Sequence, residues 1–150
     1  MAAVSVQSAW EVSTDRHRLD RAMIHGFLCG SYWAKGIPRE TVDRAIDNSY
    51  CFGVYEAGRQ IAFARVITDH ATFAYLADVF VIESHRGRGV GKHLIAAILA
   101  DERLQNLRRW LLATVDAHGL YQHFDFQPLS HPGRFLEIRR TNPYGQATGC

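Results

Sequence analysis

The stretch "HRGRGVGKHL", residues 85–94, combines three glycines with two arginines and a lysine. An apolar run, "YLADVFVI" (75–82), precedes it, and a helical run, "LIAAILA" (94–100), follows it. Glycines let several backbone N–H groups converge without obstruction by a Cβ atom. Such donors at a helix N-terminus favour an anionic ligand. The stretch therefore predicts a strand, a tight turn and a helix that together bind a phosphate-bearing ligand.

Two common phosphate-binding motifs do not fit this turn. A Walker A loop needs a glycine six residues before its lysine and Ser or Thr after it, but Arg86 and His93 flank Lys92 at these positions. A Rossmann fingerprint has the pattern GxGxxG. Gly87 and Gly89 match its first two glycines, but Lys92 stands at the position of the third. A third pattern, Arg/Gln-x-x-Gly-x-Gly/Ala, fits the six residues from Arg86 onward.

Hydrophobic periodicity and turn residues predict the elements around the turn. Helices are expected at 20–30, 39–48, 89–104 and 117–126, and strands at 4–14, 72–83, 108–115 and 134–140. A hairpin is expected over 49–68, with its turn at "AGRQ" (57–60). The strand at 72–83 is mostly apolar, which predicts burial on both faces. Antiparallel hairpins combined with a crossover predict a mixed α/β sheet.

Bulk composition excludes several classes of protein. A length of 150 residues suits one domain over 1–150, and 17 basic against 15 acidic residues give a net charge of +2, too weak to indicate nucleic acid. The N-terminus has no signal-peptide pattern, and no run of apolar residues is long enough to cross a membrane. We expect a soluble, cytoplasmic protein with no membrane partner.

The cysteines and histidines show no paired spacing. Cys29, Cys51 and Cys150 are odd in number and form no CxxC pair, which predicts free thiols in a reducing compartment. The eight histidines show no HxxxH spacing, so no metal is expected.

Two blocks of the chain resemble the GNAT N-acyltransferase superfamily, in the order that the family has them. The first is the glycine turn, with Val81 five residues before Arg86. The second is "AHGLYQHFDF", where Ala117 and Tyr121 match and Asp125 replaces the usual glycine of a Gly-Phe pair.

Outside these two blocks, one position departs from the family pattern. Thr114 stands where the family usually has Asn. The resemblance as a whole covers roughly residues 20–140. It implies a GNAT acyltransferase fold, with a mixed, mostly antiparallel central sheet flanked by helices.

The resemblance implies that the glycine turn holds the pyrophosphate of acetyl-coenzyme A. It also implies that the preceding strand splays from its neighbour, so that backbone N–H groups around Val79 to Val81 can meet the oxyanion. The expected cofactor-binding residues are Val79, Phe80, Val81, Arg86, Gly87, Arg88, Gly89, Val90, Gly91, Lys92, Tyr121 and Phe124.

Three residues are candidates for the chemistry of amine acetylation. Tyr121 is expected to donate a hydrogen bond or a proton to the leaving thiolate, and a core aromatic is the alternative. Asp78, a carboxylate in an apolar strand, is either the general base or the structural partner of Arg65. His118 is another candidate base, with a capping or surface role as its alternative, and a water chain could replace every one of the candidate bases.

The acceptor is expected on the side opposite the cofactor turn. There the resemblance places the loop "GSYWAKGIP" (30–38), whose Tyr32 and Trp33 are contact candidates or a lid over the core. Arg65 either binds an acceptor carboxylate or neutralises Asp78. We predict that Tyr32, Trp33, Arg65 and Asp78 line one pocket, and His118 completes the candidate substrate-binding set.

The resulting hypothesis is an N-acetyltransferase that moves an acetyl group from acetyl-coenzyme A to a primary amine, most simply of a small molecule, within a ternary complex. The main alternative is a non-catalytic acyl-coenzyme A sensor on the same fold. A nucleotide-phosphate module is a weaker third option. No nucleic-acid partner is expected, and a homodimer is one option that the sequence leaves open.

Overall fold

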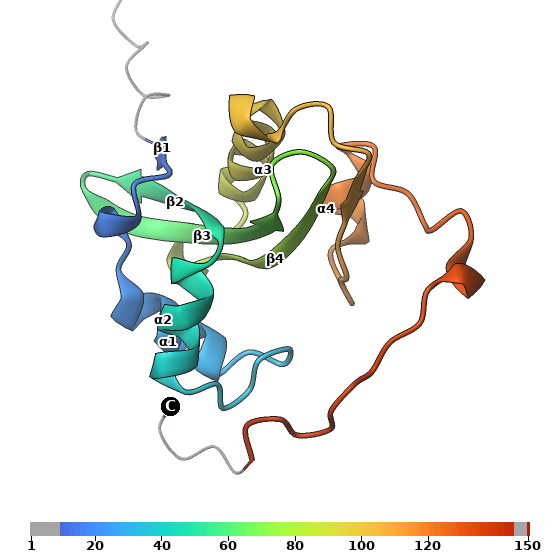
Figure 1. The fold of residues 1–150 in the computed structure, drawn as a ribbon. Helices are drawn as coiled ribbons and strands as arrows, with labels where there is room; N and C mark the ends of the chain where they lie inside the picture. The colour runs from blue at the N-terminus through green and yellow to red at the C-terminus, as the bar shows by residue number, and fades with distance from the viewer. Residues whose placement is uncertain (1–9, 146–149) are drawn as a thin grey trace, which may run out of the picture.

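The computed structural model describes residues 10–145 and 150, and its centre is a five-stranded mixed sheet (Figure 1). The strands lie in the order β1-β2-β3-β4-β5, with antiparallel pairs except for the parallel β4–β5 pair. Their bounds are β1 Trp10–Ser13, β2 Tyr50–Glu56, β3 Arg59–Thr68, β4 Phe73–Val81 and β5 Arg109–Leu111. The mostly antiparallel α/β fold expected from the sequence is therefore confirmed.

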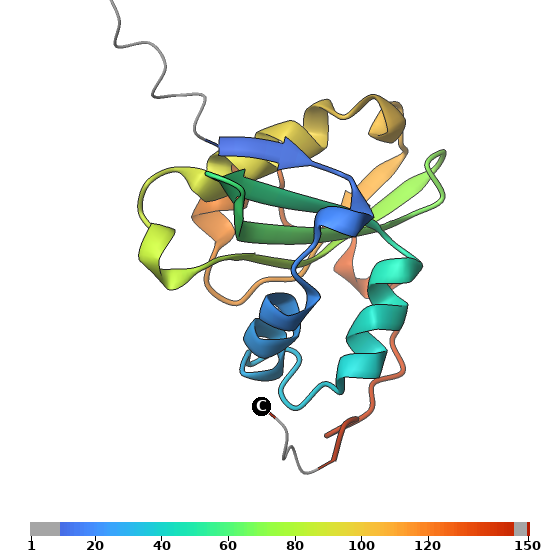
Figure 2. The ribbon, with the colours of Figure 1, turned by 90° about the vertical axis from the view of Figure 1, so that its left-hand side faces the viewer.

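Helices cover both faces of this sheet (Figure 2). Their bounds are α1 Arg21–Cys29, α2 Arg39–Asp47, α3 Val90–Ala100 and α4 His118–Gln122. One core joins α3 to side chains such as Phe52 and Val54, and the other joins α1 and α2 to Cys51 and Phe63. Neighbouring residues of β2 thus serve opposite cores, as the two-residue period of a strand requires.

Several boundaries differ from those expected. The first strand covers Trp10–Ser13, and residues 4–9 lie outside the described residues. The helix expected to reach residue 104 ends at Ala100, because Asp101 is extended and caps a separate 3₁₀ turn. Strand β5 and helix α4 are also shorter than expected, and β4 is buried on one side only along much of its length.

The strand expected at 134–140 is wrong. A 3₁₀ turn at Pro132–Arg134 is followed by an exposed extended chain that pairs with no strand among the described residues (Figure 1). Alternating apolar residues favour a strand locally, but a strand forms only where a partner supplies the ladder hydrogen bonds.

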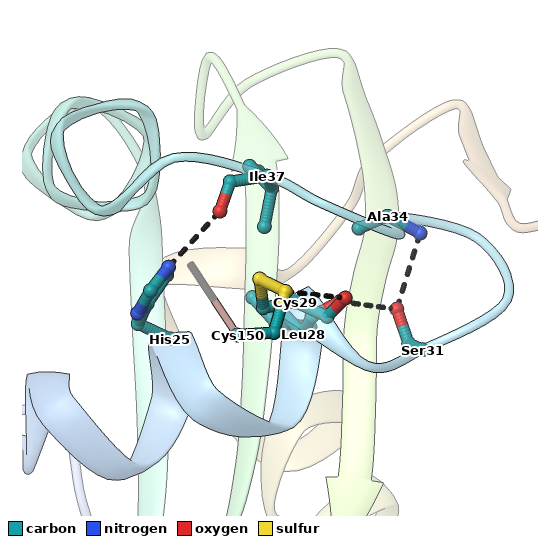
Figure 3. Close-up of a disulfide and its surroundings, with 7 residues drawn as sticks. All are labelled: His25, Leu28, Cys29, Ser31, Ala34, Ile37 and Cys150. Carbon is teal, nitrogen blue, oxygen red and sulfur yellow. Dashed lines mark hydrogen bonds between the residues drawn. A yellow bond between two sulfur atoms is a disulfide. The ribbon is translucent and has the colours of Figure 1, made fainter. Parts of the chain in front are cut away.

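The expectation of three free thiols is also wrong, because Cys29 and Cys150 form a disulfide (Figure 3). Their Cα atoms lie 5.6 Å apart although 121 positions separate them in the sequence. Cys51 is a free, buried thiol. A pairing over this distance depends on the fold, so cysteine spacing alone could not reveal it.

Among the described residues, no helix is long and apolar enough to cross a membrane. That part of the chain also holds no group of three His, Cys, Asp or Glu side chains that could bind a metal ion.

Candidate active site

Strands β4 and β5 separate after a short parallel contact. Residues 73–75 of β4 pair with Arg109–Leu111, and β4 then continues to Val81 without a strand on that side in the described chain. A cavity of about 960 Å³ lies along the unpaired part of β4 and is also lined by residues 112–117 and by Tyr121. The separation leaves backbone groups of β4 facing a space large enough for a ligand.

A bulge in β4 redirects Asp78. Arg65 is paired with Ala77 and Phe63 with Phe80, so three steps along β4 oppose two steps along β3. The bulge therefore lies between Ala77 and Phe80, and it includes Asp78, whose φ of +54° is in the left-handed region. A bulge turns a side chain out of the regular alternation, and here the Asp78 carboxylate lines the cavity.

Both oxygens of the Asp78 carboxylate accept hydrogen bonds. Arg65 Nε donates to Oδ2 at 2.8 Å, and Trp33 Nε1 donates to Oδ1 at 2.9 Å. Arg65 Nη1 also donates to the Ser49 hydroxyl at 3.2 Å. The carboxylate and guanidinium side chains are 12% and 18% exposed. A charge-assisted pair with so little exposure fixes both groups in place.

The loop at 30–38 is held in shape by hydrogen bonds of Ser31 (Figure 3). Ser31 Oγ donates to the Leu28 carbonyl at 2.7 Å and accepts from the Ala34 N–H at 3.1 Å. These bonds hold Tyr32 and Trp33, whose rings meet edge to face with centroids 5.1 Å apart. Both rings are exposed and line the cavity.

The glycine turn has the backbone that the sequence predicts. Gly87 and Gly89 have φ of +78° and +89°, and α3 begins immediately afterwards at Val90. The first N–H groups of a helix have no intrahelical acceptor, and the helix dipole adds partial positive charge there. Arg88 and Lys92 are exposed beside them. The turn therefore fits a pyrophosphate.

Two contacts fix the start of this turn. Arg86 Nε donates to the Val81 carbonyl at 3.1 Å. His85 Nε2 lies 2.8 Å from Oε2 of Glu56. The other carboxylate oxygen of Glu56, Oε1, accepts a hydrogen bond from Trp10 Nε1 at 2.9 Å. These bonds from His85 and Trp10 lower the pKa of Glu56. The turn is thus tied to the ends of β1, β2 and β4.

Tyr121 is 8% exposed on α4 and lines the same cavity. Its ring packs edge to face on Phe126, with centroids 5.8 Å apart. Burial, together with the nearby Tyr32 and Asp116, raises the pKa of Tyr121 to about 12. The side chain is therefore a neutral phenol at ordinary pH and can donate a hydrogen bond.

The structure brings most of the expected site residues together. The cavity is lined by Tyr32, Trp33, Arg65, Asp78, Val79, Phe80, Val81, Arg86, Gly91 and Tyr121. The predicted pocket of Tyr32, Trp33, Arg65 and Asp78 therefore exists. The exposed His118 does not line it, nor does Phe124. Gly87, Arg88, Gly89, Val90 and Lys92 belong to the turn outside this cavity.

Four aromatic residues of the cavity were not expected from the sequence, and these are Phe27, Phe63, Tyr75 and Tyr144. Phe27 lies on α1 and stacks on Phe80, with ring centroids 3.9 Å apart. No local pattern distinguishes such residues from core aromatics. Tyr144 reaches the cavity from the C-terminal segment, which a sequence motif could not show.

Comparisons with known proteins agree with this geometry. The sequence profile described as "Acetyltransferase (GNAT) domain" matches residues 47–128. A Gibberella zeae protein named as an acetyltransferase is 32% identical, in an alignment that covers 73% of this chain and 74% of that protein. A crystal structure of a GNAT-family acetyltransferase from Xanthomonas campestris pv. campestris is 51% identical, has a TM-score of 0.89, and is matched over 91% of this chain and 97% of its own.

A structure from Clostridium acetobutylicum with acetyl-coenzyme A shares the fold at 14% identity and a TM-score of 0.62, over 87% of this chain and 94% of its own. On the strength of the profile and the closer relatives, the chain belongs to the GNAT acetyltransferase family and is an acyltransferase.

Proposed function

We propose that the chain transfers the acetyl group of acetyl-coenzyme A to a primary amine of a small molecule, by direct attack in a ternary complex. One observation carries the proposal: the cavity beside the unpaired part of β4 is lined by Asp78 and also by Arg86 and Gly91, which lie on either side of Gly87 and Gly89. A cofactor laid along β4 from the turn would bring its thioester beside an amine held near Asp78.

Each group at the site has a role in this proposal. Backbone N–H groups of Val79 to Val81 would bind the oxyanion. Tyr121 would donate a hydrogen bond to the leaving sulfur. Full proton transfer from this phenol is unfavourable, because its pKa of about 12 exceeds that of an ordinary thiol, about 8.5. The hydrogen bond therefore matters more than acid catalysis.

The amine must lose a proton during the reaction. Asp78 and a cavity water are the candidate acceptors, and Asp78 would also attract an ammonium group electrostatically. His118 is a poorer candidate because it lies outside the cavity. Arg65 Nη2 has no hydrogen bond to a described residue, which would suit a carboxylate on the acceptor.

A panel of small amines, each with and without a carboxylate, tests the proposal by release of coenzyme A thiol. We expect turnover with at least one primary amine, and higher kcat/KM for members that carry a carboxylate. Failure of the whole panel despite cofactor binding would support a binding module or a protein acceptor instead.

Cofactor binding is tested separately by the rise in melting temperature that acetyl-coenzyme A causes. Gly89→Val should abolish this rise, because a β-branched residue is strained at φ of +89° and the turn would change shape. Gly26→Ala is the matched control, since a Cβ there meets no atom within 4 Å and φ is ordinary. An undiminished rise in Gly89→Val would contradict the placement of the pyrophosphate.

A further inference from the structure

Four side chains join the two ends of the glycine turn at 86–92. His85 precedes the turn and is 8% exposed, and its Nε2 lies 2.8 Å from Oε2 of Glu56 at the end of β2. Oε1 of Glu56 accepts a hydrogen bond from Nε1 of Trp10 in β1 at 2.9 Å. The Trp10 ring meets the ring of His93, in the first turn of α3, edge to face with centroids 5.8 Å apart. These four residues, the brace, therefore hold the turn from both sides.

The charge of Glu56 determines how the brace is bonded. Hydrogen bonds from His85 and Trp10 lower the pKa of Glu56, and the nearby positive charge of Arg88 adds to their effect. An ionised carboxylate only accepts hydrogen bonds, so Nε2 of His85 must carry a proton and donate. The other ring nitrogen, Nδ1, lies 2.8 Å from the Ser84 hydroxyl. Both nitrogens of this buried ring are thus partnered, which holds the ring in one orientation.

The turn between these anchors needs such support. Gly87 and Gly89 have positive φ, and glycine loses more backbone freedom on ordering than any other residue. A loop that is already held in its bound shape avoids this loss of entropy when the ligand binds. The four brace residues are not among those that line the cavity. Their effect on a ligand in the cavity must therefore pass through the backbone of the turn.

We propose that His85 and Glu56 are positioning residues for the pyrophosphate of the cofactor, and that Trp10 extends their hold to the start of α3. The brace keeps residues 86–92 in the shape that directs several N–H groups to one point. It thereby raises the affinity for ligands that carry a pyrophosphate and does nothing for ligands that lack one. This role rests on the proposed placement of acetyl-coenzyme A at the turn, and it reaches residues of β1 and β2 that lie outside the cavity.

Binding of coenzyme A, measured by calorimetry, tests the role. In Glu56→Ala and in His85→Leu the dissociation constant should rise about tenfold or more, because each change removes the same charge-assisted hydrogen bond. The double variant should bind like Glu56→Ala alone, since that bond is already absent there. His85→Gln should bind nearly as tightly as the wild type, because the amide nitrogen of Gln can take the place of Nε2 and donate to Glu56.

Pantetheine, which lacks the pyrophosphate, separates positioning from general damage to the fold. Its dissociation constant, measured by NMR titration, should be the same in the wild type and in every brace variant. Glu11→Ala is the matched control for loss of a carboxylate, because Glu11 also lies on β1 and pairs with Arg18 at 2.8 Å. This control should bind both coenzyme A and pantetheine as the wild type does.

Three results would overturn the role of the brace. These are undiminished binding of coenzyme A by Glu56→Ala, an equal loss for coenzyme A and pantetheine, and a His85→Gln variant that binds as weakly as His85→Leu. Failure of the cofactor placement is recognised separately. If Gly89→Val loses coenzyme A but Glu56→Ala does not, the placement stands and the brace has no role. If neither variant loses coenzyme A, the placement is wrong as well.

Discussion

Asp78 shows how one residue can combine an unusual backbone with a fixed side chain. Its positive φ marks the bulge, and its carboxylate is bound by Arg65 and Trp33. The sequence left open whether Asp78 is a base or the partner of Arg65, and the structure shows the ion pair. Pairing does not prevent contact with an amine, because each carboxylate oxygen can accept more than one hydrogen bond. The catalytic role of Asp78 stays a prediction.

At the same scale, Tyr121→Phe tests the hydroxyl of the candidate hydrogen-bond donor. Phe keeps the ring that packs on Phe126 but removes the oxygen. We expect kcat to fall about 10²-fold or more, the scale typical of losing one hydrogen-bond donor to a developing negative charge. Cofactor affinity and melting temperature should barely change. The measurements are steady-state kinetics with an accepted amine and thermal unfolding with and without cofactor.

Two results would contradict this role of Tyr121. Full activity in Tyr121→Phe would mean that water or another donor meets the leaving sulfur. A variant that unfolds would instead leave the catalytic role without support and would favour the alternative stated from the sequence, a core aromatic.

At the scale of elements, the sequence pattern predicted those helices, strands and turns that depend on residues close together in the chain. The turn with Gly87 and Gly89, the hairpin and the strand before the turn follow from glycine spacing and apolar runs. The bulge at Asp78 could not be predicted, because it exists only in the register between two strands. The prediction of a strand at 134–140 and the predicted length of β5 were wrong for the same reason, because pairing depends on what lies beside a strand in space.

The β3–β4 turn gives a prediction about pH. Asp69 accepts hydrogen bonds from the backbone N–H groups of Thr72, Ala71 and Phe73 and from the Thr72 hydroxyl, and these bonds hold its pKa well below the ordinary range. A carboxyl whose pKa is lower in the folded state stabilises the fold above its unfolded pKa, about 4. This contribution is lost as the pH falls toward the folded-state pKa.

Asp69→Asn removes the charge while keeping one acceptor. We expect the wild type to exceed the variant in free energy of unfolding by a constant amount above about pH 5, and the difference to shrink as the pH falls below about 4. Urea unfolding at a series of pH values measures it. Thr72→Val, which removes one donor, should weaken the same dependence. A difference that stays constant down to pH 3 would show that the charge of Asp69 contributes nothing.

At the scale of the whole molecule, the disulfide joins Cys29 at the end of α1 to Cys150 (Figure 3), a sequence separation of 121. It fastens the end of the chain beside the loop that carries Tyr32 and Trp33. The cytoplasmic location expected from the sequence stays a prediction, and it now has a consequence. A reducing cytosol would reduce this disulfide, so the protein would act there with Cys29 and Cys150 as free thiols.

Cys150→Ser measures what that link contributes. A disulfide that closes a long loop lowers the entropy of the unfolded chain, so the variant should lose about 2–4 kcal/mol in free energy of unfolding. The melting temperature should fall by roughly 5–15 °C for a chain of this size. Wild type treated with a reductant should have the same melting temperature as the variant, and the reductant should not change the melting temperature of the variant.

Thiol titration provides the control, because Cys51 is buried and burial raises the pKa of its thiol to about 11. A thiolate is the reactive form, so Cys51 should stay unreactive in the folded protein. The oxidised native protein should therefore show no reactive thiol. The reduced native protein should show that of the exposed Cys150, and unfolding of the reduced protein should add those of the buried Cys29 and Cys51. A reactive thiol in the untreated native protein, or a melting temperature that reductant does not alter, would mean that the bond between Cys29 and Cys150 does not stabilise the fold.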